Sequence, residues 1–250
     1  MRKYNYCCLL LSILFMFSCQ SADSNIKESV PANKVVTEKT VKPKQTHIKG
    51  VDVSHYQGKI DWTKLIDEQC YFAYAQATDG ITFFDPMFSV NWTAMKANGI
   101  YRGAYHFFQP EDDPIKQADS FIKAVKTLEI NDLPPMLDLE IMENGISKED
   151  YQQNVLKWLT YVEEKLGKKP FVYTNPSFAN NHLNDKIFSN YILWIAEYGV
   201  DAPKVPNAWV DKGWAIWQFN SKGKLNGING HVDMDTFKGD LADFKAMMSL

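Results

Sequence analysis

From about residue 48 to residue 250, short apolar runs alternate with longer amphipathic stretches. A parallel strand pair needs a crossover segment, usually a helix, so this alternation is typical of an α/β fold with a mainly parallel sheet. Roughly eight runs have strand character, and the helical patterns between them weaken in the C-terminal half. We therefore expect a (β/α) barrel of the TIM-like kind that is irregular late in the chain, with an open doubly wound sheet as the alternative. The clearest runs cover 50–54, 71–78, 100–108, 136–140, 171–174, 191–196 and 214–219.

The N-terminus has the composition of an export signal. Basic residues precede an apolar stretch over 7–17, which is shorter than the roughly 20 residues of a membrane-spanning helix. A charged start, an apolar middle and a small residue, Ser18, predict a signal peptide over 1–18. Cys19 follows directly, as in a bacterial lipobox, so we expect Cys19 to be lipidated. An ordinary signal peptide or a short membrane anchor is the alternative.

The segment 19–47 differs in composition from the rest of the chain. It contains Pro31 and Pro43 but no aromatic residue, so it cannot bury enough apolar surface to fold and is predicted to be a flexible linker. Residues 48–250 are expected to form one domain, in which Cys70 has no cysteine to pair with. The net charge of -3 gives no basis for a nucleic-acid partner. We expect a membrane-anchored lipoprotein of the cell envelope that faces the periplasm or the exterior.

Carboxylates interrupt several of the apolar strand runs. An unpaired charge is costly to bury, so an acid inside such a run suggests a functional role. In (β/α) barrels the active site lies at the carboxyl ends of the strands, where acids from the first, fourth and last strands can converge. The acids in question are Asp52, Asp138, Glu140, Asp233 and Asp235.

Asp138 and Glu140 are separated by one residue in the run 136–140. Side chains alternate across a strand, so both carboxyls face the same side, about 6.5 Å apart along the chain. When two acids share a partly apolar site, the pKa of one rises above that of the other, which leaves one as a proton donor and the other ionised. Glycoside hydrolysis needs one protonated and one ionised carboxyl. The alternative is a structural cluster, for instance one paired with Arg102.

Aromatic side chains accompany these acids at or near the ends of the predicted strands. Sugar rings have apolar faces that pack on aromatic rings, so a cleft lined in this way suits a glycan. The expected substrate-contacting aromatic residues are Tyr56, Tyr105, Phe107, Tyr173, Trp194, Tyr198 and Trp217.

Several segments occur together in one order along the chain. They are GVDVSHYQGKIDW (50–62), YAQATDG (74–80), GAYHFF (103–108), PPMLDLE (134–140), YTNP (173–176), LWIAEY (193–198), WAIWQF (214–219) and GHVDMDTF (230–237). In these segments the chain resembles glycoside hydrolase family 25, the lysozymes. The resemblance covers essentially the whole domain and implies a flattened, irregular (β/α) barrel.

The resemblance also implies a reaction and a set of roles. Members of the family cut the β-1,4 bond between N-acetylmuramic acid and N-acetylglucosamine in peptidoglycan. By motif, Glu140 is the general acid/base, Asp138 orients the substrate's 2-acetamido group, and Asp52 and Asp233 complete the acidic cluster. Net retention with the acetamido group as internal nucleophile follows, a known exception to the two-carboxylate scheme. Gln218, in the segment 214–219, joins the expected substrate-binding residues.

The chain departs from the family pattern at three positions. Gln76 and Asp79 stand where the family often carries Lys and Glu, and Asp235 stands where Asn is frequent. Asp235 is still expected to be a substrate-binding residue. We expect these departures to change substrate affinity or the pH optimum rather than the reaction.

Two other functions remain open from the sequence: a glycan-binding pseudoenzyme, and a barrel glycosidase acting on another amino sugar polymer. His55, His106 and His231 lack the H-x-x-x-H or H-E-x-x-H spacing of a metal site, and there is no Gly-rich phosphate loop. We therefore expect no metal and no cofactor. The expected partners are peptidoglycan strands and a membrane reached through the lipid anchor, and the protein is expected to be a monomer.

Overall fold

The computed structural model describes residues 47–143 and 145–248. These residues belong to one compact unit of the chain, 43–250. The predicted signal peptide (1–18), Cys19 and the linker up to residue 46 lie outside the described residues, so those assignments stay predictions. Within the described ranges, no helix has both the length and the apolar character needed to cross a membrane.

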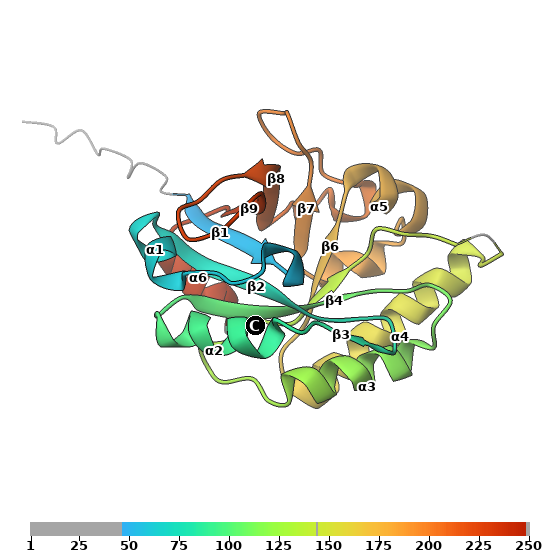
Figure 1. Ribbon diagram of the computed structural model, residues 1–250. Helices are drawn as coiled ribbons and strands as arrows, with labels where there is room; N and C mark the ends of the chain where they lie inside the picture. Colours follow the sequence, from blue (N-terminus) through green and yellow to red (C-terminus); the bar gives the residue numbers. More distant parts are fainter. Residues whose placement is uncertain (1–46, 144, 249–250) are drawn as a thin grey trace, which may run out of the picture. The chain divides into compact units, whose positions relative to one another are not determined.

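A nine-stranded sheet closes on itself to form the centre of the molecule (Figure 1). The strand order is β1-β9-β8-β7-β6-β5-β4-β2, and the pairing of β1 with β2 closes the barrel. The short β3 (Phe83–Phe84) pairs only with the end of β2. The barrel strands are β1 (Ile48–Val53), β2 (Cys70–Asp79), β4 (Tyr101–Phe107), β5 (Met136–Asp138), β6 (Phe171–Thr174), β7 (Leu193–Ala196), β8 (Ile216–Gly223) and β9 (Val232–Phe237).

One strand of the barrel runs against the others. β9 is antiparallel to both of its neighbours, β8 and β1. All other neighbouring barrel strands, from β1–β2 round to β7–β8, are parallel. The connection 224–231 between β8 and β9 contains no helix, so it cannot act as a crossover, and a direct return gives an antiparallel pair. The predicted irregular (β/α) barrel is confirmed, and its last strand begins where the other strands end.

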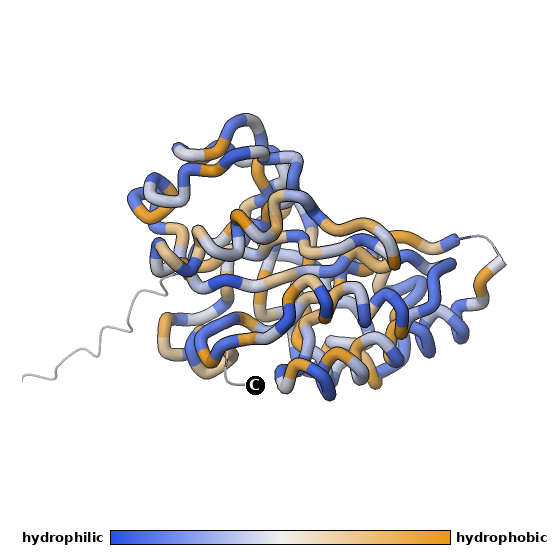
Figure 2. The backbone as a smooth tube through the Cα atoms, turned by 60° about the horizontal axis from the view of Figure 1, so that its bottom comes forward, coloured by the Kyte–Doolittle hydropathy of each residue, from blue (hydrophilic) through white to orange (hydrophobic). Residues whose placement is uncertain are grey.

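Helices surround the barrel, and the helices after α4 have no more than eight residues, consistent with the weak helical patterns expected late in the chain. The longest, α4, begins after Ser147, whose hydroxyl accepts a hydrogen bond from the Asp150 amide at 3.0 Å, and ends at Gly167 in the left-handed conformation. In Figure 2, hydrophilic and hydrophobic residues alternate along the outer helices, as expected for helices with one face on the barrel. The helices are α1 (Trp62–Asp67), α2 (Phe88–Ala97), α3 (Pro114–Val125), α4 (Lys148–Leu166), α5 (Pro176–His182) and α6 (Leu241–Met248), with 3₁₀ turns η1 (His55–Gln57), η2 (Lys186–Asn190) and η3 (Asn207–Trp209).

The barrel interior is filled by large aromatic side chains, including Phe72, Tyr74 and Trp194. Glycines on adjacent strands make room for them. A Cβ at Gly103 would lie 2.3 Å from the Tyr74 ring, and one at Gly50 would lie 2.2 Å from the Phe72 ring. A second apolar layer lies between the outside of the barrel and the helices.

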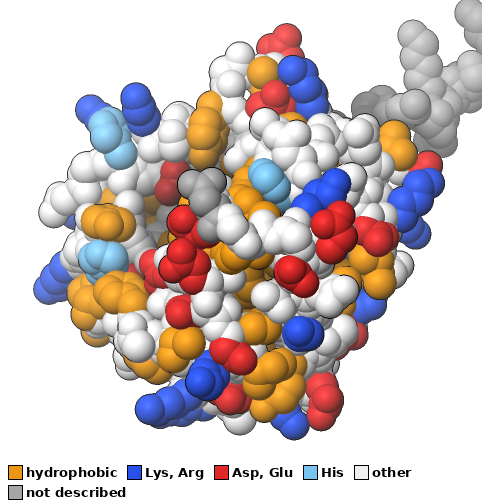
Figure 3. Space-filling model, turned by 90° about the vertical axis from the view of Figure 1, so that its right-hand side faces the viewer, with side chains coloured by type: hydrophobic (Ala, Val, Ile, Leu, Met, Phe, Trp, Pro, Cys, Tyr) orange, Lys and Arg blue, Asp and Glu red, His pale blue; other side chains and the backbone are white. Residues whose placement is uncertain are grey.

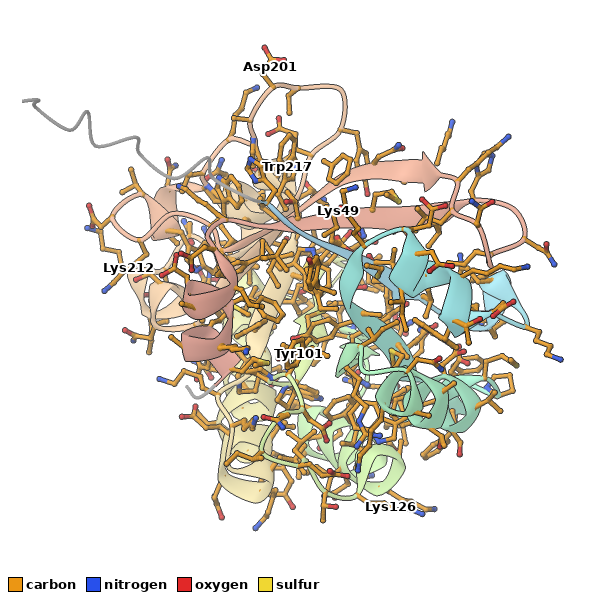
Figure 4. The ribbon with its side chains drawn as sticks, turned by 90° about the vertical axis from the view of Figure 1, so that its left-hand side faces the viewer. Lys49, Tyr101, Lys126, Asp201, Lys212 and Trp217 are labelled. Atoms are coloured by element: carbon orange, nitrogen blue, oxygen red, sulfur yellow. The ribbon has the colours of Figure 1, made fainter. Side chains whose placement is uncertain are left out.

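The two ends of the barrel are closed differently. Figure 4 looks at the end where β1 and β4 start, marked by Lys49 and Tyr101. Phe244 of α6 packs there against Tyr101 and Phe237, with ring centroids 5.6 and 5.3 Å apart. Helix α6 therefore covers this end with apolar side chains, and the polar cavity of the molecule lies at the opposite end.

Candidate active site

The acids predicted from the strand pattern meet in one cavity at the carboxyl end of the barrel. The cavity has a volume of about 440 Å³, and Asp52, Asp138, Glu140 and Asp233 all line it. Figure 3 faces the side of the molecule toward which β1 and β4 run, and acidic side chains gather near its middle, beside a hollow. Residues as far apart as 52 and 233 are thus neighbours in space.

Strand alternation and strand direction explain how the acids reach this cavity. Asp138 ends β5 and Glu140 follows two residues later, so both point inward while Leu137 and Leu139 are fully buried in the outer apolar layer. Asp233 is the second residue of β9. Because β9 is antiparallel, its start lies at the carboxyl ends of the parallel strands, and Asp233 joins the cavity from there.

The cavity raises the pKa values of its acids. Burial, and then the charge of Asp233, raises the pKa of Asp52 to about 8. Burial, and then the charge of Glu140, raises the pKa of Asp233 to about 6. Removal from water disfavours a carboxylate, and a second negative charge adds to the effect. Part of this cluster therefore holds protons near neutral pH.

The Asp138 and Glu140 carboxyls titrate as an interacting pair. Burial raises the pKa of Asp138 well above its usual range, with the charge of Glu140 as the next cause. Desolvation also raises the pKa of Glu140. Protons on such a pair belong to the pair rather than to one member. The site can thus keep a proton ready for transfer at a pH where an isolated carboxyl would have lost it.

Gln218 links the acids on opposite walls of the cavity. Its Nε2 donates a hydrogen bond to Asp52 Oδ2 at 2.6 Å. Its Oε1 accepts from the Tyr173 hydroxyl at 2.9 Å and from the Tyr198 hydroxyl. Since Oε1 can only accept and Nε2 can only donate, the phenols and Asp52 together fix the orientation of the amide. Gln218 therefore lies at the cavity as predicted, with both ends of its amide engaged.

Tyr173 extends this network to Glu140. Its hydroxyl donates to Gln218, and its hydrogen-bonding influence on Glu140 lowers the pKa of Glu140 and so opposes the effect of burial. A phenol has one proton, so Tyr173 can donate to Glu140 when that carboxylate is ionised and to Gln218 when Glu140 is protonated. Tyr198 continues to donate to Gln218 in both cases.

The predicted contact residues are divided between the cavity and the core. Trp194 and Asp235 are 0% exposed and lie in the barrel interior, and Trp194 Nε1 donates to Asp235 Oδ1 at 3.2 Å. The charge of Asp52 contributes to raising the pKa of Asp235, after burial. The expected substrate contact by Trp194 and Asp235 is therefore corrected: both side chains lie in the barrel interior, below the cavity.

Trp217 requires a second correction. In β8, Ile216 is part of the barrel interior and Gln218 lines the cavity, so Trp217 points to the other side of the sheet. Its Nε1 donates to the Glu197 carbonyl at 2.8 Å, and it is not among the residues that line the acidic cavity. The remaining predicted aromatic residues do line it: Tyr56, Tyr105, Phe107, Tyr173 and Tyr198.

Residues outside the predicted site also line the cavity, among them Gln57, Gln76 and Asp79. Gln76 and Asp79 lie near the end of β2, where polar residues in an apolar strand are the same signal that identified the acids. Gln57 was not predictable in this way. Its side chain accepts from the Ser54 amide at 2.9 Å and closes a capping box around η1, which brings this turn to the rim.

The histidines near the site have structural hydrogen-bond partners. His55 Nδ1 lies 2.9 Å from Asp85 Oδ2. His106 lies between Thr78 and Gln117, and burial lowers its pKa to about 4, so it is neutral. Among the described residues, no group of three or more His, Cys, Asp or Glu side chains could hold a metal ion.

A cluster of carboxyls with aromatic walls, at the carboxyl end of a (β/α) barrel, defines a glycosidase site. Comparisons with known proteins agree. The family model of glycosyl hydrolases family 25 matches residues 51–228. The chain therefore belongs to glycosyl hydrolase family 25, and the protein is a glycosidase.

Known relatives cover most of the chain. It is 31% identical over 221 residues to Lysozyme M1 of Streptomyces globisporus, spanning 84% of this chain and 74% of that protein. It is 35% identical over 212 residues to the uncharacterized protein YegX of Escherichia coli (strain K12), spanning 82% and 75%. The crystal structure of a bacterial lysozyme from Streptomyces coelicolor superposes with a TM-score of 0.77 at 30% identity, covering 82% of this chain and 99% of that chain.

Proposed function

We propose that this glycosidase is a peptidoglycan hydrolase of the muramidase type. It cleaves the β-1,4 bond between N-acetylmuramic acid and N-acetylglucosamine, with Glu140 as proton donor. The observation that carries the proposal is the convergence of Asp52, Asp138, Glu140 and Asp233 in one aromatic-walled cavity. The relatives named lysozyme and N,O-diacetylmuramidase support the choice of substrate.

In the first step, Glu140 gives its proton to the glycosidic oxygen as the bond to the anomeric carbon breaks. The carbonyl oxygen of the substrate's 2-acetamido group attacks the same carbon and forms a cyclic intermediate. Asp138 accepts the acetamido N–H and stabilises its growing positive charge. In support, Asp138 Oδ1 is buried and has no hydrogen-bond partner among the described residues.

In the second step, Glu140 acts as a general base instead of a general acid. Its carboxylate removes a proton from a water molecule, and the water oxygen attacks the anomeric carbon while the acetamido oxygen leaves. Each displacement inverts the anomeric carbon, so two displacements leave the product with the same anomeric configuration as the substrate. The Tyr173 hydroxyl supports this alternation, since it can donate to Glu140 in the ionised stage and to Gln218 in the protonated stage.

The first prediction tests Glu140. Replacing it by glutamine removes the transferable proton while keeping the shape, so lysis of purified sacculi should fall by about 10²–10⁴-fold, with unchanged thermal stability. Turbidity measures the lysis and circular dichroism the melting. The matched control is Glu143→Gln, an exposed position three residues further on, which should lyse sacculi like the wild type. Equal lysis by Glu140→Gln and wild type would remove Glu140 from its role.

Product analysis tests the bond and the stereochemistry. After borohydride reduction, mass spectrometry should find muramic acid at the new reducing ends, and early NMR spectra should show the β-anomer. Reduced glucosamine instead would assign the enzyme to another bond. Glycan binding without any turnover by the wild type would indicate a pseudoenzyme.

We further propose that the protein is exported by residues 1–18 and held in the cell envelope by a lipid on Cys19. The segment 19–47 would act as the tether, and the enzyme would act as a monomer. The sequence of the N-terminus supports the anchor. Labelled palmitate should be incorporated by the wild type but not by Cys19→Ser, which should leave the membrane fraction.

A further inference from the structure

The end of the barrel opposite the acidic cavity carries exposed lysines and exposed apolar side chains. It is formed by the starts of the parallel strands, by the end of β9 and by α6. The chain enters the barrel from this side, because β1 begins here at Ile48. We call this surface the amino-terminal end of the barrel.

Exposed lysines surround the amino-terminal end. Lys49 is the second residue of β1, Lys126 follows α3, and Lys212 lies in the turn before β8. Figure 4, which looks at this end, shows the three on different sides of Tyr101. Among residues 47–143 and 145–248, no carboxylate lies within ion-pair distance of these three ammonium groups. Their charges are therefore available to a partner.

Most acids at the same end are engaged by partners within the fold. Asp132 Oδ1 lies 2.7 Å from Arg102 Nε, and Glu129 Oε2 accepts from Lys96 Nζ at 2.7 Å. Further engaged acids are Glu163, which pairs with Lys169, and Asp240 and Asp243, which accept amides at the start of α6. The acids that line the cavity lie at the other end of the barrel. The two ends of the barrel therefore differ in charge.

Large apolar side chains are exposed between these lysines. Ile130, in the turn before β5, is 86% exposed, Val210, before β8, is 64% exposed, and Tyr71, at the start of β2, is 43% exposed. Lys168 Nζ donates to the Ile130 carbonyl at 3.0 Å and to the Met248 carbonyl at 3.2 Å, which joins the Ile130 turn to the end of α6. Apolar side chains beside lysines suit the boundary of a bilayer, where the apolar part inserts and the ammonium stays in water.

We propose that the amino-terminal end docks on the anionic lipid surface of the membrane in which Cys19 is anchored. The inference rests on the proposed lipid anchor. A coil of the length of the predicted linker spans about 30 Å on average. This is less than the diameter of a domain of this size, about 40 Å. The linker joins the barrel at the start of β1, so the end that carries the lysines is the end that meets the membrane.

Electrostatics gives the docked domain one orientation. Each lysine close to an anionic bilayer strengthens binding by about fivefold. The same headgroups repel the acidic side chains that gather on the opposite face, the one seen in Figure 3. Contact through the amino-terminal end therefore leaves the acidic cavity facing away from the lipid, toward glycan strands.

The test uses the lipidated protein in vesicles. Asn131→Cys places a thiol beside Ile130 for an NBD fluorophore, and lipids with a doxyl group quench that fluorophore on contact. Cys70 is buried, so the label goes to the new thiol. Vesicles that contain anionic phosphatidylglycerol should quench the label about twofold or more, whereas phosphatidylcholine alone should not. Salt at about 1 M, which shortens the screening length to about 3 Å, should remove the quenching.

A second label and two sets of lysine variants are the controls. A label at Glu111→Cys, an exposed position after β4 at the cavity end, should stay unquenched in both kinds of vesicle. Changing Lys49, Lys126 and Lys212 together to Glu should abolish quenching at position 131, because the docking charge is reversed. The matched variant has the same net charge and should keep the quenching; it changes three exposed lysines elsewhere to Glu, namely Lys59, Lys116 and Lys222.

The outcomes separate the docking surface from the anchor. An unquenched label at position 131, equal quenching at positions 131 and 111, or equal loss in the two lysine variants would overturn the docking surface. Protein that does not float with the vesicles would overturn the lipid anchor and this inference with it. The muramidase activity is measured separately, by lysis of sacculi.

Discussion

At the scale of single residues, the site depends on how one hydroxyl is shared. Tyr173 and Tyr198 both donate to Gln218 Oε1, and of the two only Tyr173 lowers the pKa of Glu140. Burial raises the pKa of Glu140 and the bond from Tyr173 lowers it, so the working pKa reflects the balance of the two effects. The effect of Tyr173 on Glu140 can therefore be tested with a Tyr173 variant, and the same change at Tyr198 serves as the control.

Tyr173→Phe should raise the pKa of Glu140, because it removes the hydrogen bond that favours the ionised carboxylate. A general acid is active while protonated, so activity is lost as pH rises through its pKa, and a higher pKa moves that loss to higher pH. We expect the basic limb of the kcat/KM profile to shift upward by about half a unit to one unit. Tyr198→Phe also loses a bond to Gln218 and should leave the limb in place; equal shifts in both variants would contradict the assignment.

At the scale of elements, the rim of the cavity depends on a buried carboxylate outside it. Asp85 Oδ2 accepts the His55 amide at 2.8 Å and lies 2.9 Å from His55 Nδ1, and Asp85 Oδ1 accepts the Met87 amide at 2.8 Å. Asp85 thus joins η1 to the turn before α2. Because η1 carries Tyr56, which is 83% exposed and lines the cavity, this joint positions an aromatic side chain for a glycan.

Asp85→Ala should lower the free energy of unfolding by about 2–4 kcal/mol, since it leaves several donors without an acceptor. It should also raise KM for glycan strands several-fold, because Tyr56 loses its support. Denaturant unfolding and steady-state kinetics measure the two effects. The control Asp113→Ala removes the N-cap of α3 and should cost about 1 kcal/mol with no change in KM. If Asp85→Ala lost stability but kept the KM of the wild type, the proposed role of η1 in substrate binding would be wrong.

At the scale of the whole molecule, the barrel is layered from an apolar end to a polar end. Helix α6 covers the first end, aromatic rings fill the middle, and the acids occupy the other end. Asp235 lies at the boundary, fully buried, and its Oδ1 accepts a hydrogen bond from Trp194 Nε1. Burial, and then the charges of Asp52 and Asp233, raise the pKa of Asp235 well above its usual range. The folded barrel therefore holds protons that the unfolded chain would release.

Asp235→Asn should change how stability depends on pH. The unfolded aspartate loses its proton near pH 4 whereas the folded one keeps it, so the stability that this proton supplies is present at low pH and is lost as pH rises through the raised pKa. Asparagine has no such proton. The free energy of unfolding of the variant, relative to that of the wild type, should therefore rise by at most about 1.4 kcal/mol per pH unit above pH 4. Thermal melts between pH 4 and pH 8 measure the gap; parallel curves would show that Asp235 is ionised in the fold.

The alternation of apolar runs with amphipathic stretches was enough to predict the fold class, and the period of two along a strand was enough to place Asp138 and Glu140 on one face, because both patterns are local. Neither pattern could show that Trp194 and Asp235 lie below the cavity, since depth depends on how far each strand is staggered against its neighbours. Only the closed barrel decided that.

The sequence by itself determined which residues are acids in apolar strands, and it predicted that acids of the first, fourth and last strands converge at the carboxyl end of a barrel. The tertiary structure alone decided that β9 runs backwards, which delivers Asp233 to the same rim as Asp138 and Glu140. The physical reason is that residue type and alternation are properties of a local segment, whereas strand direction and stagger arise only when distant segments pack together.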